Sequence, residues 1–307
     1  TTLFRSEVRE GIDCVDSQMR QLFIERMELA DTVAQIKAEK GDTIYKPDRE
    51  ATLIEKQSAG MDEALSMEYQ AFLKRMIAVS RKYQYRRMLE LKGGFPHVYR
   101  TKEPLCRRLV ALAGEIMSDE GCSASSDAAF SNLFGTGHRE EVTWETVDSY
   151  GEMSRRIHGG EADAGIGILE EVGGGVSDGL HGLLVQQGLY IYKCEIYQNQ
   201  GILRKIALLG KELVVCRDHN RLKLAFVCPN TSGSLGNVLA MIADYGFNLT
   251  EIHSAPFRVE SGWNYRFFVE MEVNLAKSNT QALICQLDQE TEELRILGSY
   301  CCHGDFV

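Results

Sequence analysis

The first third of the chain carries cationic and hydrogen-bonding side chains whose spacing suits a small anionic ligand. The set consists of Arg9, Arg26, Lys37, Arg49, Glu50, Ser80 and Gln84. On a helix, Arg26 and Lys37 would share nearly one face and lie about 16 Å apart along the axis. Two long cationic side chains at this spacing can close on a dianion between them.

Neutral donors and a third cation extend this set. Ser80 and Gln84 stand at positions i and i+4, so they share a helix face and offer hydrogen bonds into the same space. Arg9 lies about 25 Å of helix rise from Arg26, too far for both to bind one small ligand from a single straight helix. If Arg9 belongs to the site, it must come from a second chain.

The residues that must position this set are helical by pattern. Between residues 4 and 40, apolar side chains recur at three- and four-residue steps: Ile12, Val15, Met19, Leu22, Phe23, Leu29, Val33 and Ile36. We predict one long helix there, a second from Pro47 to about Ser58 and a third from about Asp62 to Leu91. A helix of about 36 residues is about 54 Å long, so its apolar stripe calls for a partner chain.

Composition and charge place limits on the class of protein. The chain has 307 residues and a net charge of −10. Residues 1–92 are neutral overall, so the whole negative balance belongs to the rest of the chain. This charge argues against nucleic acid as the main partner, and no stretch approaches the roughly 18 apolar residues of a membrane span. Nine cysteines without metal-ligand spacing indicate a reducing compartment. We therefore expect a soluble, cytoplasmic protein without a metal.

The pattern changes after residue 93. Residues 95–220 read as mixed α/β, with apolar runs at 164–169 and 189–192. The glycines at 173–175 lack phosphate-loop spacing, so a plain turn is favoured. Beyond them we predict a strand at 222–228, a helix at 233–246, an extended segment at 247–257, a strand at 264–273 and a helix at 277–293. That order is typical of a ferredoxin-like module.

The polar set resembles that of the all-helical chorismate mutases. The resemblance covers residues 5–90 and rests on Val8-Arg9-Glu10-Gly11-Ile12-Asp13, on residues 24–30, on Lys37, on Pro47-Asp48-Arg49-Glu50, and on Ser80 and Gln84. It implies a domain-swapped homodimer that converts chorismate to prephenate by a Claisen rearrangement, without a cofactor. One position departs from the family, because Lys46 stands where an acid is frequent.

The resemblance also implies a role for each residue. Arg9 of the partner and Arg26 would clamp the two carboxylates, and Lys37 and Gln84 would donate to the ether oxygen. Glu50 would take the ring hydroxyl, Arg49 would support Glu50, and Ser80 would bond a carboxylate.

The carboxy-terminal part is similar to the ACT domain of prephenate dehydratases, which senses amino acids. The similarity rests on Gly233-Ser234-Leu235, on residues 246–256 and on residues 263–268. It implies a regulatory site that includes Gly233, Ser234, Leu235, Asn248, Leu249, His253 and Ser254. In that family phenylalanine binds between paired domains near a Glu-Ser-Arg-Pro segment, which here reads His253-Ser254-Ala255-Pro256. Phenylalanine and tyrosine both stay open as effectors.

The middle of the chain is similar to part of a prephenate dehydratase. Residues 160–170 resemble the segment before the Glu-Asn-Thr/Ser motif of that family, but Glu170-Glu171-Val172 follows here. The Thr-Arg-Phe motif would fall at residues 203–206, which lack the threonine. About 126 residues also suit one α/β lobe, whereas a dehydratase site lies between two. We expect a shortened lobe without dehydratase activity.

These observations predict a multidomain protein. Residues 1–93 would form the all-α mutase domain, residues 94–220 the truncated α/β lobe and residues 221–307 the α+β, ferredoxin-like ACT domain. The predicted function is a chorismate mutase regulated through the ACT domain. Two alternatives remain: a bifunctional mutase and dehydratase that makes phenylpyruvate, and a non-catalytic sensor or interaction protein on the same scaffold.

Overall fold

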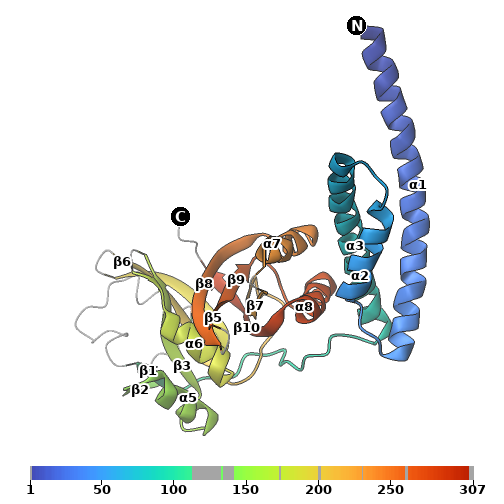
Figure 1. The fold of residues 1–307 in the computed structure, drawn as a ribbon. Coiled ribbons are helices and arrows are strands. Elements are labelled where there is room, and N and C mark those ends of the chain that lie inside the picture. The colour runs from blue at the N-terminus through green and yellow to red at the C-terminus, as the bar shows by residue number, and fades with distance from the viewer. Residues whose placement is uncertain are drawn as a thin grey trace. The chain divides into compact units, whose positions relative to one another are not determined.

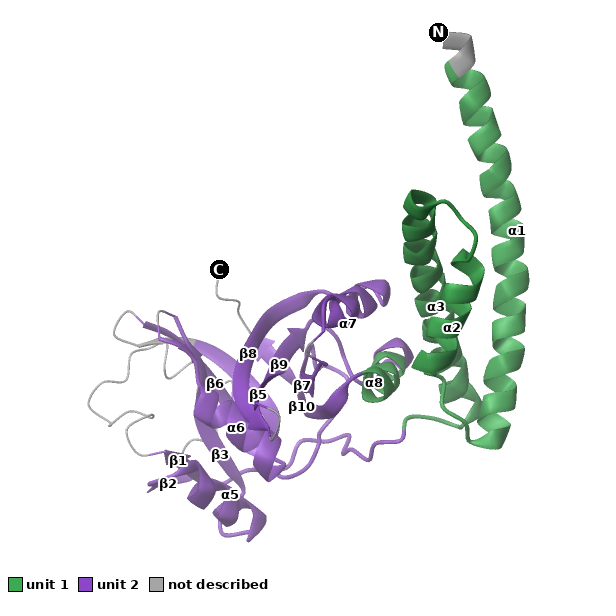
Figure 2. Ribbon diagram, in the orientation of Figure 1, with its two compact units in different colours: residues 1–95, 281–290 green, residues 96–280, 291–307 purple. Residues whose placement is uncertain are grey.

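The computed structural model describes residues 2–112, 133, 142–172, 174–199, 202–229, 231–259 and 262–303. The chain divides into two compact units, shown in Figure 2. Unit 1 contains residues 1–95 and 281–290, and unit 2 contains residues 96–280 and 291–307. Among the helices described, none combines the length and apolar character needed to cross a membrane.

Unit 1 contains the three predicted helices. They are α1 (Thr2–Lys40), α2 (Pro47–Ser58) and α3 (Glu63–Leu91) (Figure 1). Gly41, with φ of 68°, follows the end of α1 in the left-handed conformation that glycine adopts without strain. Pro47 opens α2, and Asp48 and Glu50 lie in its first turn, where the helix dipole favours acidic side chains. The predicted bounds agree with the observed ones to within two residues.

Packing in unit 1 is uneven along α1. Ala30 and Ala34 are buried on the second half of α1, and Leu73 and Ile77 are buried on α3. The first half of α1 carries a stripe of exposed apolar side chains: Val8, Ile12, Val15, Met19, Leu22 and Phe23. Exposure within this stripe reaches 64% at Leu22. In Figure 1 this part of α1 extends beyond α2 and α3, so the described chain leaves it uncovered.

The first part of unit 2 is a small α/β lobe. Its elements are β1 (Arg108–Leu112), β2 (Thr143–Val147), α5 (Tyr150–His158), β3 (Ala164–Glu171), β4 (Gly175–Val176), α6 (Asp178–Gln187), β5 (Tyr190–Asn199) and β6 (Ile202–Gly210). β1 pairs in parallel with β2 and β3, and β6 pairs antiparallel with β3 and β5. Because β5 pairs directly with β6, which follows it in the chain, no second lobe is inserted between these strands. Of the predicted glycine turn, Gly174 and Gly175 precede or begin β4, and Gly173 lies outside the described residues.

The carboxy-terminal part of the chain, of which residues 281–290 fall in unit 1, has the predicted ferredoxin-like order. It runs β7 (Arg221–Val227), α7 (Ser234–Asp244), β8 (Leu249–Val259), β9 (Gly262–Met271), α8 (Ser278–Glu290) and β10 (Glu292–His303). Its strands lie in the order β10-β7-β9-β8, and all three neighbouring pairs are antiparallel. The last strand, β10, was not predicted. The multidomain fold class predicted from the sequence is thus confirmed.

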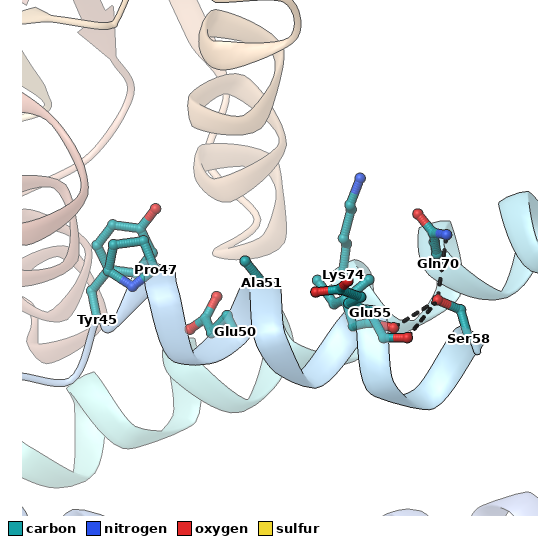
Figure 3. Close-up of a pocket in the computed structure, with 9 residues that line it drawn as sticks. Tyr45, Pro47, Glu50, Ala51, Glu55, Ser58, Gln70 and Lys74 are labelled. Carbon is teal, nitrogen blue, oxygen red and sulfur yellow. Dashed lines mark hydrogen bonds between the residues drawn. The ribbon is translucent and has the colours of Figure 1, made fainter.

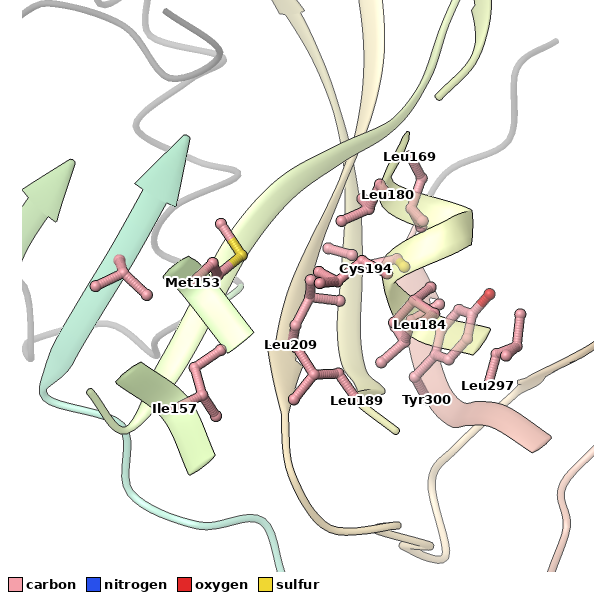
Figure 4. Close-up of a cluster of buried hydrophobic side chains, with 14 of the residues drawn as sticks. Met153, Ile157, Leu169, Leu180, Leu184, Leu189, Cys194, Leu209, Leu297 and Tyr300 are labelled. Carbon is pink, nitrogen blue, oxygen red and sulfur yellow. The ribbon is translucent and has the colours of Figure 1, made fainter. Parts of the chain in front are cut away.

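One sheet joins the lobe to this module. The end of β10 pairs in parallel with β5, with Cys301 opposite Lys193 and Cys302 opposite Cys194, so the two cysteines are part of a strand. A shared hydrophobic core lies at the junction (Figure 4), where Leu180 and Leu184 of α6 pack in one cluster with Leu209 of β6 and Tyr300 of β10. Apart from residues 281–290, the middle and carboxy-terminal segments therefore form one compact unit.

Candidate active site

A cavity of about 240 Å³ lies among the three helices of unit 1. Its walls include six of the seven residues singled out in the sequence: Arg26, Lys37, Arg49, Glu50, Ser80 and Gln84. Leu29, Ala30, Val33, Ile44, Lys46, Leu53, Ile77 and Arg81 complete the lining. The structure therefore places six of the predicted site residues, from α1, α2 and α3, around a single cavity.

Hydrogen bonds connect the two cations of α1 to neighbouring segments of the site. The Arg26 guanidinium donates a hydrogen bond to the Ser80 hydroxyl, which in turn donates to the backbone oxygen of Met76 at 3.1 Å. The Lys37 ammonium donates to the backbone oxygen of Ile44 at 2.8 Å. Both cations are half-buried, and each is held by one of these hydrogen bonds.

The charge of the cavity suits an anion. Five cationic residues line it, namely Arg26, Lys37, Lys46, Arg49 and Arg81, against one acid, Glu50. Burial lowers the pKa of Arg26. Burial and, next, the charge of Lys46 lower the pKa of Lys37 from its ordinary value. A dianionic ligand would relieve this crowding of positive charge.

Gln84 has an unmet polar group. Its side chain is 9% exposed, and its Oε1 atom forms no hydrogen bond with any residue that the structure describes. A buried polar atom without a partner costs about 1–3 kcal/mol. Rotating the amide by a half-turn presents either its oxygen or its NH₂ group, so a ligand in the cavity could satisfy it.

Arg81 is the cavity residue that the sequence analysis missed. Its guanidinium donates to Glu50 and also to Glu290, where the Nε–Oε1 and Nη2–Oε2 distances are both 2.9 Å. Residues 281–290 belong to unit 1, so this pair lies within that unit. Because Arg81 follows Ser80 directly, it points about 100° away from Ser80 on the helix, and only the tertiary structure reveals its contact with Glu50.

Arg9 does not line this cavity. It lies in the exposed first half of α1, among the uncovered apolar residues.

A second hollow, of about 470 Å³, lies along α2 (Figure 3). Glu50 lines both spaces, but the second one also contains Glu55 and has Lys74 as its single cation. The cavity around Arg26 and Lys37 is therefore the one suited to a dianion.

The predicted regulatory residues lie at two places in unit 2. Gly233, with φ of 84°, precedes α7, and Ser234 and Leu235 begin that helix. Asn248 donates to Glu272 at 3.0 Å just before β8, which contains Leu249, His253 and Ser254. The His253 ring stacks on Phe268 with centroids 4.7 Å apart. A role for these residues in binding an effector stays a prediction.

Internal ion pairs occupy the positions of the dehydratase motifs. Arg204 donates to Glu171 at 2.6 Å, and Lys205, 5% exposed, pairs with Glu270. Glu170, which follows the dehydratase-like segment, has a pKa raised by burial and by the nearby Glu251. The charged side chains at 171, 204 and 205 are thus already engaged by the fold.

Comparison with known proteins agrees with this division of the chain. Residues 8–85 match the family model of chorismate mutase type II. A bifunctional chorismate mutase/prephenate dehydratase from Aquifex aeolicus is 30% identical over 81 residues, which are 26% of this chain and 22% of that protein. Arogenate dehydratase/prephenate dehydratase 6 from Arabidopsis thaliana is 27% identical over 128 residues, 37% of this chain and 31% of that protein. The chain thus spans less than a third of the length of either relative.

A solved structure extends the likeness beyond the helices. Prephenate dehydratase from Streptococcus mutans superposes with a TM-score of 0.50 at 18% identity, over 64% of this chain and all of that one. Since residues 1–95 are under a third of the chain, more than half of the aligned residues lie after residue 95. The amino-terminal helices therefore match the chorismate mutase type II model, and the region that follows has a fold like that of a prephenate dehydratase.

Proposed function

We propose that this protein rearranges chorismate to prephenate in the cavity of unit 1. The observation that carries the proposal is that Arg26, Lys37, Arg49, Glu50, Ser80 and Gln84, from three helices, line one cationic cavity. The match of residues 8–85 to the mutase family supports it. Chorismate is a dianion, which fits the five cations and single acid of the lining.

The reaction requires positioning and electrostatic stabilisation rather than a nucleophile. The substrate must be held in its compact chair-like form, and negative charge that develops on the ether oxygen must be stabilised. Arg26 and Ser80, already bonded to each other, would bind a carboxylate through the planar fork of the guanidinium. The Lys37 ammonium and the Gln84 amide would donate to the ether oxygen.

Glu50 would bind the ring hydroxyl of the substrate. In the structure its carboxylate pairs with Arg81, so the Glu50 side chain is held in place before substrate enters. Arg49 precedes Glu50 in the first turn of α2 and would support Glu50 in this role. Lys46, which replaces the acid frequent in the family, pairs with Asp42 instead.

The second carboxylate of the substrate would be bound by Arg9 of a partner subunit. Two observations support this part of the proposal: Arg9 is too far along α1 to reach its own cavity, and the surrounding face of α1 is apolar and exposed. A second copy of α1 covering that stripe would bring its Arg9 to the cavity. The homodimer would contain two equivalent sites.

The proposed function is tested by incubating the full chain with chorismate. We expect the absorbance of chorismate to fall and prephenate to appear, and we expect no phenylpyruvate unless the sample is acidified. The second expectation follows from the single lobe that the described residues form and from the internal ion pairs of Arg204 and Lys205. Unchanged chorismate would favour a non-catalytic sensor, whereas phenylpyruvate formed at neutral pH would favour the bifunctional enzyme.

The proposal also predicts how activity depends on pH. Lys37 acts in its charged form, and its pKa is lowered by burial and then by Lys46. Activity is therefore present at lower pH and is lost as pH rises through this lowered pKa. As pH rises, we expect the decrease in kcat/KM to have its midpoint at a pH lower than 10.5, the ordinary pKa of lysine.

The variant Lys37→Arg checks that assignment. Arginine keeps its charge to above about pH 12. The kcat/KM of this variant, expressed relative to its own value at neutral pH, should therefore not decrease at alkaline pH. An alkaline decrease of the same midpoint in both proteins would assign it to another group.

A further inference from the structure

We propose that Glu103, Cys216 and His219 form a zinc-binding site in unit 2. Glu103 lies in the segment that leads to β1, and Cys216 and His219, separated by two residues, lie in the connection between β6 and β7. One ligand atom from each residue lies within 4.8 Å of the other two. This site is separate from the mutase cavity, and its test does not depend on the proposed function.

The geometry is close to that of a metal site. The Glu103 Oε1 and His219 Nε2 atoms are 3.8 Å apart. Ligand atoms at zinc bond lengths around a tetrahedral ion are about 3.3–3.8 Å from one another. Small side-chain rotations would therefore place all three atoms around one ion, with water in the fourth position.

His219 supplies an observation that points to a ligand. Its side chain is 0% exposed, yet its Nε2 atom makes no hydrogen bond to any described residue. The other ring nitrogen, Nδ1, accepts a hydrogen bond from the Cys216 backbone amide at 3.3 Å and lies 3.4 Å from the Ser299 hydroxyl. Zinc binding through Nε2 would require the ring proton on Nδ1, where it would be donated to Ser299 in place of the Cys216 contact; such an outer hydrogen bond is typical of histidines that bind metals.

The charges of the other two residues also suit zinc. Lys193 pairs with Glu103 Oε2 at 2.7 Å, which leaves Oε1 directed at His219. The Cys216 thiol donates to the backbone oxygen of Thr101 at 3.5 Å. On binding Zn²⁺, this thiol would release its proton to solvent and form a sulfur–zinc bond, so that one thiolate and one carboxylate balance the ion.

A second group of similar composition is not available for a metal. His181, Glu251 and His253 also lie within reach of one another. Lys223, however, donates to Oε1 of Glu251, and Lys205 lies 3.4 Å from Oε2. Two ammonium groups thus already occupy both carboxylate oxygens of Glu251, whereas Lys193 occupies only one oxygen of Glu103.

Zinc would fasten two segments that the backbone already brings together. The Arg100 amide donates to the backbone oxygen of Leu213 at 2.8 Å, and the Val215 amide donates to that of Arg100 at 2.8 Å. A metal bound by Glu103, Cys216 and His219 would close the same junction through side chains. Its binding should therefore raise the melting temperature of unit 2.

Zinc titration of the metal-free full chain tests this proposal. We expect one zinc ion per chain and, with Co²⁺ as a probe, a thiolate-to-cobalt charge-transfer absorption. The variant Cys216→Ser keeps a hydroxyl donor for Thr101 but removes the thiolate, and we expect it to bind zinc at least about 100-fold more weakly. His219→Gln should do the same.

The matched control is Cys14→Ser, which removes an exposed thiol in unit 1. It should bind zinc like the unchanged chain. No saturable binding by the unchanged chain, or equal affinity in the Cys216→Ser variant with its fold intact by circular dichroism, would overturn the proposal.

Discussion

The variant Lys37→Ala is expected to lower kcat for chorismate about 100-fold or more. The proposed role of Lys37 is to stabilise charge on the ether oxygen, and removal of one such donor from an enzyme site costs about 100- to 1000-fold in rate. Gln84→Ala, which removes the second donor to the same oxygen, should lower kcat by a similar factor. Initial rates of chorismate loss under saturating substrate measure both effects.

The chain offers a matched control for this experiment. Lys40 lies in the last turn of α1 and is exposed, and it is absent from the cavity lining. Lys40→Ala should retain near-normal turnover. Because Lys37 also bonds the backbone oxygen of Ile44, a thermal melt of the Lys37→Ala variant must show that unit 1 remains folded. Near-normal turnover of folded Lys37→Ala would remove this residue from the mechanism.

The helices of unit 1 could be predicted because each rests on local chemistry. Apolar residues at three- and four-residue steps mark α1, Pro47 marks the first residue of α2, and Gly41 ends α1. The spacing of Arg26 and Lys37 along one helix is likewise a local property. That residues of α1, α2 and α3 share a cavity was inferred from a family resemblance, and the structure supplies the geometry.

Features that depend on distant contacts were not predicted. Arg81 contacts Glu50 across 31 positions of sequence, and Ser80 beside it points to a different side of α3. Strand β10 begins two residues after α8 ends, and its pairing with β7 and β5 is set by the sheet rather than by its own pattern. The single sheet shared by the lobe and the ferredoxin-like module follows from this strand, so it was also missed.

Mixing two inactive variants is expected to restore activity if Arg9 acts from the partner subunit. Arg9→Ala and Lys37→Ala chains should each lose nearly all turnover when alone. In a mixed dimer, one site contains Lys37 from the first chain and Arg9 from the second, so it is intact, whereas the other site lacks both. When equal amounts are unfolded and refolded together, about half of the dimers are mixed, and turnover should recover to about a quarter of the unchanged protein.

This recovery separates a shared site from an independent one. If Arg9 acted in the site of its own chain, every site in every dimer would lack either Arg9 or Lys37, and mixing would restore no turnover. Arg5→Ala, which removes an exposed arginine one turn away on α1, should stay active alone and so shows that loss of charge on this part of α1 is tolerated. Because Arg9 sits in the uncovered apolar stripe, activity that reappears only after mixing would also identify the partner of that stripe as a second copy of this chain.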